Sequence, residues 1–99
     1  MESLSYSRSV SREEILRIFQ DFASFDKPLP ILKGSQSEVY GVTYPPIKDC
    51  LEKEEKSINF VLILGWVENE AQLEIYGENL KEESLPEKIS NFIKKYFKK

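Results

Sequence analysis

A single long apolar run, Ser57–Val67, limits the folds that this chain can adopt. Its sequence is Ser-Ile-Asn-Phe-Val-Leu-Ile-Leu-Gly-Trp-Val, and such β-branched and aromatic residues favour strands over helices. The run is about half as long as the ~20 residues that a transmembrane helix needs. It therefore predicts a strand, and it predicts no membrane span.

This strand would be apolar on both of its faces, because successive side chains of a strand point to opposite sides. A strand of this kind is typical of the middle of a sheet that is covered on both faces, either by helices or by a second copy of the protein. One face would carry Ile58, Phe60, Leu62, Leu64 and Trp66, and the other Val61, Ile63 and Val67 with Asn59 and Gly65.

Length and composition predict one globular domain over residues 1–99. Hydrophobic residues make up 40% of the 99 positions and aromatic residues 12%, which is ordinary for a chain with a single core. The net charge of −3 gives no general attraction to nucleic acid or to anionic lipid. The first residues lack the pattern of a signal peptide, and the single Cys50 suits a reducing compartment. We therefore expect a cytoplasmic protein.

A helix is predicted from Ser11 to near Asp26. Ser11 and Glu14 form a Ser-x-x-Glu capping box, and Val10 is placed to pack against Ile15 at the helix start. Prolines at positions 28 and 30 should end the helix. Its apolar side chains recur at helical spacing, at Ile15, Ile18, Phe19, Phe22 and Phe25.

Shorter patterns predict the other strands. Pro30–Lys33 and Glu38–Tyr44 are expected as strands before the apolar run, and Ala71–Gly77 as its partner after a turn at Glu68-Asn69-Glu70, in which Asn69 is able to take a positive φ. The alternation of Ser with larger residues over positions 1–10 predicts a tail, or a short edge strand at Leu4–Ser9. Residues 47–56 are expected to form a short helix or a loop.

A second helix is predicted from Ser84, where Ser-x-x-Glu again supplies a capping box and Pro86 lies in the first turn. The expected fold is α+β and two-layered, with an antiparallel sheet of about four strands and the order α-β-β-β-β-α. The apolar face of this helix would carry Leu85, Ile89, Phe92, Ile93 and Tyr96, and the opposite arc Lys88, Lys94, Lys95 and Lys98.

Few residues are suited to catalysis. The chain has no His, the commonest general base and metal ligand, so Cys50 lacks the usual activating partner. The Glu68–Glu70 pair supplies fewer oxygens than a calcium loop requires. We therefore predict no catalytic residue, no metal, no cofactor and no enzymatic activity. The other carboxylate pairs suit solvated turns and helix starts, at Glu13/Glu14, Glu54/Glu55 and Glu82/Glu83.

The charged side chains are mainly Lys and Glu, with only three Asp. Lys and Glu enrichment is common in hyperthermophile proteins. In composition the chain resembles small orphan proteins of hyperthermophilic archaea and of their viruses. The resemblance covers no motif, and it implies a thermophilic or viral source without assigning a role to any residue.

The sequence supports two hypotheses on function and ranks a third, an enzyme with a carboxylate-based site, last. The first is a non-catalytic protein-interaction module that forms a homodimer or binds another protein, because two helices are few to cover both faces of the central strand. The candidate interface residues are Trp66, Val61, Ile63, Tyr40 and Tyr76.

The alternative is a nucleic-acid-associated protein that uses the C-terminal lysines, which are interleaved with aromatic residues. A solvated face of an amphipathic helix explains the same pattern. The candidate phosphate contacts are Lys94, Lys95, Lys98 and Lys99.

Overall fold

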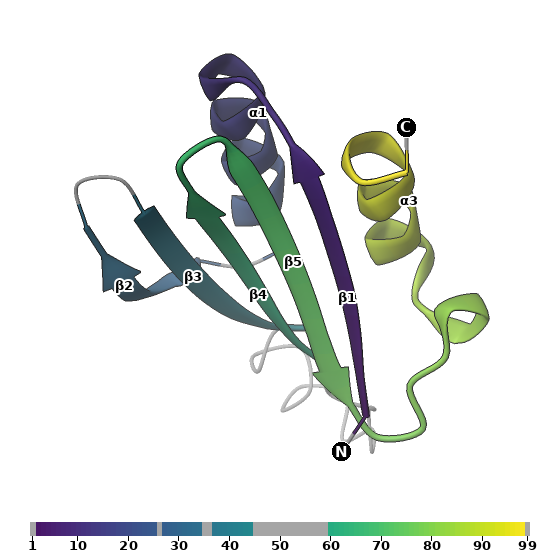
Figure 1. Ribbon diagram of the computed structural model, residues 1–99. Helices are drawn as coiled ribbons and strands as arrows, with labels where there is room; N and C mark the ends of the chain where they lie inside the picture. The colour runs from purple at the N-terminus through teal and green to yellow at the C-terminus, as the bar shows by residue number, and fades with distance from the viewer. Residues whose placement is uncertain (1, 26, 35–36, 45–59, 99) are drawn as a thin grey trace.

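The computed structural model describes residues 2–25, 27–34, 37–44 and 60–98, and within them an antiparallel sheet is combined with two α-helices (Figure 1). The expected α+β class is therefore confirmed. None of the helices in the described part of the chain is long and apolar enough to cross a membrane. The elements are β1 (Glu2–Ser9), α1 (Arg12–Ala23), β2 (Leu29–Lys33), β3 (Ser37–Tyr44), β4 (Phe60–Val67), β5 (Glu70–Gly77), the 3₁₀ turn η1 (Glu82–Ser84) and α3 (Glu87–Tyr96).

The sheet has five strands in the described part of the chain, in the order β1-β5-β4-β3-β2, and each neighbouring pair is antiparallel. The apolar strand β4 lies at the centre, as predicted from the apolar run 57–67. Residues 47–56, expected as a short helix or loop, lie outside the described residues, as do residues 57–59 at the start of the predicted strand.

The predicted strand number and element order were wrong, because a strand precedes the first helix. Strand β1 pairs along its whole length with β5, from Glu2 opposite Gly77 to Ser9 opposite Glu70. Its Leu4 and Tyr6 are half-buried against the core, while the alternating serines are exposed. The edge-strand alternative was therefore correct, but serine is a weak strand signal and only pairing with β5 makes this segment regular.

The first helix begins as the capping box predicts. The hydroxyl of Ser11 accepts a hydrogen bond from the backbone N–H of Glu14 at 3.2 Å, and Val10 and Ile15 are both buried. The helix ends at Ala23, earlier than the predicted Asp26. Ser24 closes its last turn, because the Ser24 hydroxyl donates to the carbonyl of Asp21 at 2.6 Å.

The second helix begins later than predicted, at Glu87. Ser84 does not cap it, because its hydroxyl donates to the carbonyl of Lys81 at 3.0 Å and Ser84 ends the 3₁₀ turn. Pro86 occupies the N-cap position of α3 and makes no side-chain cap. The predicted apolar face is confirmed, since Leu85, Ile89, Phe92, Ile93 and Tyr96 are all buried.

The turn between β4 and β5 has two residues, Glu68 and Asn69, and it reverses the chain between the paired residues Val67 and Glu70. Glu68, with φ of 55°, is the turn residue in the left-handed region. The positive φ that Asn69 was able to take is adopted by Glu68 instead.

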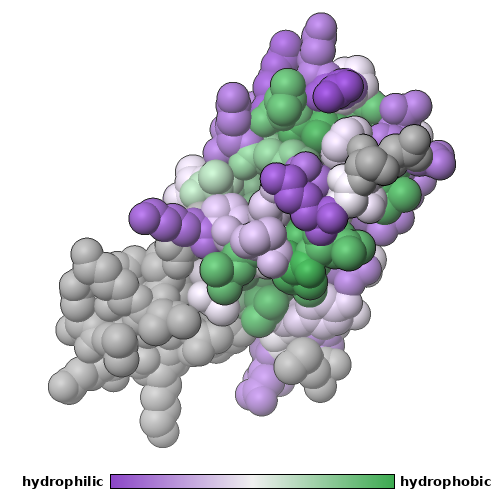
Figure 2. Space-filling model, turned by 90° about the vertical axis from the view of Figure 1, so that its left-hand side faces the viewer, coloured by the Kyte–Doolittle hydropathy of each residue, from purple (hydrophilic) through white to green (hydrophobic). Residues whose placement is uncertain are grey.

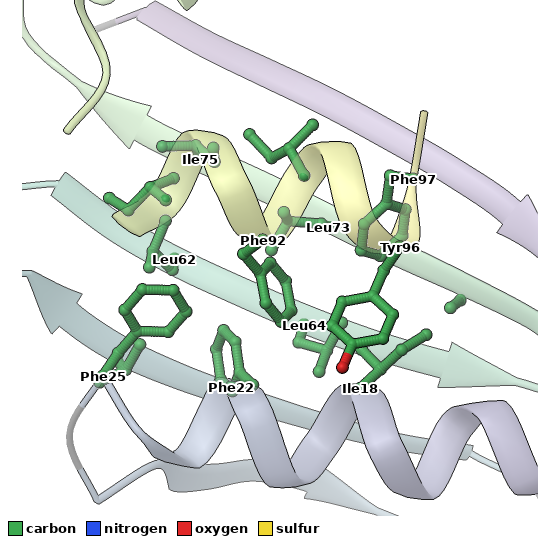
Figure 3. Close-up of a cluster of buried hydrophobic side chains, with 14 of the residues drawn as sticks. Ile18, Phe22, Phe25, Leu62, Leu64, Leu73, Ile75, Phe92, Tyr96 and Phe97 are labelled. Atoms are coloured by element: carbon green, nitrogen blue, oxygen red, sulfur yellow. The ribbon is translucent and has the colours of Figure 1, made fainter. Parts of the chain in front are cut away.

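Both helices pack on the same face of the sheet, and the core lies between them and the strands (Figure 3). The ring of Phe92 from α3 lies 6.2 Å from that of Phe22 and 5.5 Å from that of Phe25, measured between centroids. Leu62 and Leu73 form part of the sheet side of this core and are each 1% exposed. The helices thus cover one face of the sheet, and we call the opposite face the open face.

Candidate functional site

The open face follows directly from the alternation of side chains along the strands. Strand β4 turns Phe60, Leu62 and Leu64 to the helices, so Val61, Ile63 and Val67 lie on the open face. Because paired residues of neighbouring strands share a face, the registers extend this assignment across the sheet. The open face carries Leu29, Ile31, Leu32, Ser37, Val39, Gly41, Thr43, Val61, Ile63, Gly65 and Val67 on β2–β4, and Ser3, Ser5, Ser7, Ser9, Glu70, Gln72, Glu74 and Tyr76 on β1 and β5.

A bulge in β2 enlarges the apolar part of this face. The register shifts between Pro30 and Leu32, so Leu29 lies opposite Gly41 and Leu32 opposite Val39. Ile31 also lies on the open face, since a Cβ added to Gly41 would stand 2.9 Å from the Cδ1 atom of Ile31. Three apolar side chains of one short strand therefore share one face.

These β2 side chains are unusually exposed for their type. The exposed fractions are 73% for Leu29, 60% for Ile31 and 57% for Leu32, and on β4 they are 37% for Val61 and 50% for Val67. Figure 2 views the molecule from the β2 side and shows apolar surface gathered there between charged side chains. We call the open-face residues of β2–β4 the apolar half.

The rest of the open face, on β5 and β1, is polar. The amide of Gln72 donates to the carboxylate of Glu70 at 3.0 Å, and the phenol of Tyr76 donates to Glu74. That hydrogen bond to Glu74 raises the pKa of the Tyr76 phenol above its ordinary value. Glu70 and Glu74 are the charged side chains of the open face within the described strands, which add no cation to it.

The five residues predicted for the interface do not lie together. Val61, Ile63 and Tyr76 are on the open face, whereas Trp66 and Tyr40 are on the helix-covered face and pack against the core. The ring of Tyr40 lies 5.2 Å from that of Phe19 on α1. Strand alternation already separates Trp66 from Val61 and Ile63, but the sequence does not say which of the two faces the helices cover.

The largest apolar contribution to the open face, from β2, was missed. Pro30–Lys33 was predicted as a strand, but a regular alternation would send Ile31 and Leu32 to opposite faces. Only the bulge turns both to the same side, and it becomes visible only in the register with β3. The signal available in the sequence was the high apolar content of so short a strand beside two prolines.

The C-terminal lysines do not form one free cationic patch. The ammonium of Lys95 lies 3.2 Å from a carboxylate oxygen of Asp21, and Lys98 forms an ion pair with Glu82. Lys94 is exposed on the outer side of α3, and Lys99 lies outside the described residues. Two of the four candidate phosphate contacts are thus already paired with carboxylates.

A shallow groove of about 190 Å³ lies between α1 and α3. Lys88 and Lys95 flank it, Phe25 and Phe92 line it, and each charged group already has a partner. The ammonium of Lys88 donates to the carbonyl of Ser24 at 3.0 Å and stands 5.1 Å from the centroid of the Phe25 ring. The groove therefore presents helix-to-helix contacts rather than convergent groups aimed at a ligand.

No group of three or more possible metal-binding side chains occurs among the residues that the structure describes. Of the carboxylate pairs named above, Glu14 forms an ion pair with Arg8 at 3.1 Å and Glu82 one with Lys98. Cys50 and the Glu54/Glu55 pair lie outside the described residues.

No known family model, curated protein or solved structure matches this chain.

Proposed function

We propose that this protein is a small non-catalytic interaction module that binds protein through the apolar half, with a second copy of itself as the partner. The carrying observation is that the central strand β4 buries Phe60, Leu62 and Leu64 on its helix side, while its other side is apolar and exposes Val61 and Val67. A strand that is apolar on both faces is a feature of sheets covered on both faces.

The chemistry of the open face supports this function. Exposed apolar side chains scattered singly are normal, but contiguous ones mark interaction sites. Here they lie on β2 and β4, with the half-buried Val39 on β3 between them, and the charged side chains of the described strands on this face are Glu70 and Glu74 on β5. Depletion of charge at the centre of a patch with polar groups at its border is the composition that distinguishes interfaces from other surface.

The alternative, a nucleic-acid surface on α3, has weaker support. Lys95 and Lys98 are engaged by Asp21 and Glu82, so phosphates would have to displace these carboxylates. The net charge of −3 also opposes association with a polyanion. We expect no anisotropy change when duplex DNA, single-stranded DNA or RNA is titrated with the protein at low salt.

The proposal is tested by the mass of the protein in solution and by two matched variants. Leu32 on the open face and Leu16 on α1 have similar exposed fractions, 57% and 59%, so each accepts a charge without disturbing the core. Sedimentation velocity over a range of concentrations should show the parent and Leu16→Glu as dimers at high concentration. Leu32→Glu should remain monomeric and should keep the parent's circular dichroism spectrum.

A parent protein that stays monomeric at every concentration would overturn self-association. If Leu32→Glu formed dimers at the same protein concentrations as Leu16→Glu, the association would use a surface other than the apolar half.

A further inference from the structure

The two edges of the sheet differ in how well they could accept a further strand. Strand β2 forms one edge and β1 the other (Figure 1). At the β2 edge, Pro30 has no backbone N–H to donate and a bulge follows it, and both features hinder the addition of a strand. Strand β1 contains no proline or glycine, and its eight residues pair with β5 without a register shift. The β1 edge therefore keeps a regular row of backbone groups.

The outward backbone groups of β1 belong to its serines. The N–H of Val10 donates to the carbonyl of Asn69 at 2.8 Å, which continues the β1–β5 ladder past its last register pair. Because hydrogen-bonded and non-bonded pairs alternate along an antiparallel ladder, the even-numbered residues of β1 bond to β5 as Val10 does. The residues that direct their N–H and C=O groups away from β5 are Ser3, Ser5 and Ser7. No other segment in the described part of the chain forms a backbone hydrogen bond with these groups.

The open face beside this edge is hollowed. Ser5 and Ser7 carry small side chains, and their register partners on β5 are Glu74 and Gln72. These four residues, together with Tyr6, line a hollow of about 180 Å³. Glu74 supplies a carboxylate on the inner side of the hollow, and the described strands add no cation to this face. Hydroxyl and amide groups beside a carboxylate suit a cationic side chain, which forms strong hydrogen bonds to such acceptors.

We propose that the β1 edge binds an extended segment of a partner protein, which adds a strand to the sheet and carries a lysine or arginine on its open-face side. The backbone of this segment pairs with Ser3, Ser5 and Ser7, a mode of recognition in which main-chain hydrogen bonds supply affinity and alternate side chains supply specificity. The cationic side chain lies across the serines and reaches Glu74. The added strand is two strand spacings, roughly 10 Å, from β5, and a long basic side chain and the Glu74 side chain together span that distance.

The other face of the added strand meets apolar groups. Leu4 and Tyr6 alternate with the serines, lie on the helix side and are half-buried against the core. The partner segment therefore alternates basic residues with apolar ones. Near the end of β1 the guanidinium of Arg8 is held by the carbonyl of Tyr96 at 3.0 Å and by the carboxylate of Glu14 at 3.1 Å. The helix side is occupied there, so the segment lies beside the preceding residues of β1.

Charge distinguishes this occupant from a second copy of the protein. The open-face residues of β1 are all serines, so two copies paired through β1 would set serine against serine and bring no cation to Glu74. The net charge of −3 also favours a basic partner. This site goes beyond the proposed function and does not depend on it, because it uses β1 and β5, whereas the apolar half lies on β2–β4.

A synthetic peptide tests the site. The probe is a fluorescein-labelled peptide of seven residues, blocked at both ends, in which valine and lysine alternate. We expect its fluorescence anisotropy to rise to saturation as the protein is added, with a Kd below about 1 mM. A matched peptide with glutamate in place of lysine should not bind, because its charges would face Glu74.

Three protein variants locate the peptide, with circular dichroism as the check on folding. Ser5→Pro removes one outward N–H and leaves the ladder to β5 intact, because proline is tolerated where an edge strand faces solvent. It should weaken binding about tenfold. Glu74→Gln should weaken binding about two- to fivefold, the range of an exposed ion pair. Leu32→Glu, which changes the apolar half, should bind the peptide as the parent does.

Each other result overturns this site. A parent that does not bind the lysine peptide, or binds the glutamate peptide equally well, would show that the edge does not select a basic strand. Unchanged binding by both Ser5→Pro and Glu74→Gln would place the peptide elsewhere, and loss of binding in Leu32→Glu would place it on the apolar half. If Ser5→Pro lowered the mass of the protein in sedimentation, a second copy would occupy the β1 edge.

Discussion

The phenol of Tyr96 at the end of α3 donates a hydrogen bond to the carboxylate of Asp21 in the last turn of α1, joining residues 75 positions apart. Figure 3 shows the Tyr96 ring beside those of Phe22 and Phe92, with its oxygen directed toward α1. Lys95 reinforces the contact at 3.2 Å from the same carboxylate. This pair fixes the two helices to each other on the covered face and leaves the open face unconstrained.

Phenylalanine variants of Tyr96 and Tyr6 should differ in stability, because the Tyr96 phenol donates a hydrogen bond and the Tyr6 phenol does not. The Tyr6 hydroxyl is buried without a hydrogen-bond partner in the described part of the chain, and burial raises its pKa. Tyr96→Phe should cost about 1–2 kcal/mol, because it removes a hydrogen bond to a charged group. Tyr6→Phe should be neutral or stabilising by up to about 1 kcal/mol. Urea denaturation measures both, and equal losses would contradict the assignment.

The Asp21 carboxylate should make stability depend on pH in the acid range. The hydrogen bond from Tyr96 holds the pKa of Asp21 below its ordinary value of 3.8, with a further contribution from Lys95. A depressed folded-state pKa stabilises the protein fully above 3.8 and loses that contribution as the pH falls through the folded value. The parent should therefore exceed Asp21→Asn in stability at pH 7, and the difference should shrink below pH 3.8. A difference that stays constant from pH 7 to pH 2 would contradict this linkage.

The sequence predicts the parts of this fold in which local pattern and tertiary packing agree. Ser11, the spacing of Ile15, Ile18 and Phe22, and the alternation along β4 all indicate the observed elements. Local pattern fails where the outcome depends on a distant partner. Strand β1 becomes a strand through β5, and Ser84 repeats a capping pattern that Pro86 and the 3₁₀ turn override.

The candidate surface was predictable only in part. The sequence places Val61 and Ile63 on one side of β4, but it does not specify that both helices pack on the other side. That choice depends on how α1 and α3 meet through rings such as those of Phe22 and Phe92. The face on which Leu32 lies could not be predicted for a different reason. A bulge in β2 changes the face of every residue that follows it in the strand.

The two serines that precede the helices give a test of capping. Both begin a Ser-x-x-Glu sequence, but only Ser11 accepts a hydrogen bond from the helix start. Ser11→Ala should lower the free energy of unfolding by about 1 kcal/mol. Ser84→Ala should change it by no more than about 0.5 kcal/mol, because Ser84 lies in an exposed turn. Equal effects of the two changes on the denaturation midpoint would argue against this difference in capping.

Neighbouring residues of β4 test the division between the two faces of the sheet. Leu62 is 1% exposed beneath the helices, whereas Val61 is 37% exposed on the open face. Leu62→Ala should cost about 2–5 kcal/mol through lost burial and the cavity that remains. Val61→Ala, measured in urea at a concentration where the protein is monomeric, should cost less than about 1 kcal/mol. Sedimentation should show the further effect of Val61→Ala. This change should weaken the dimer, because the Val61 side chain belongs to the apolar half. If Val61→Ala destabilised the monomer as much as Leu62→Ala, a second buried layer would cover the open face and no partner would be needed there.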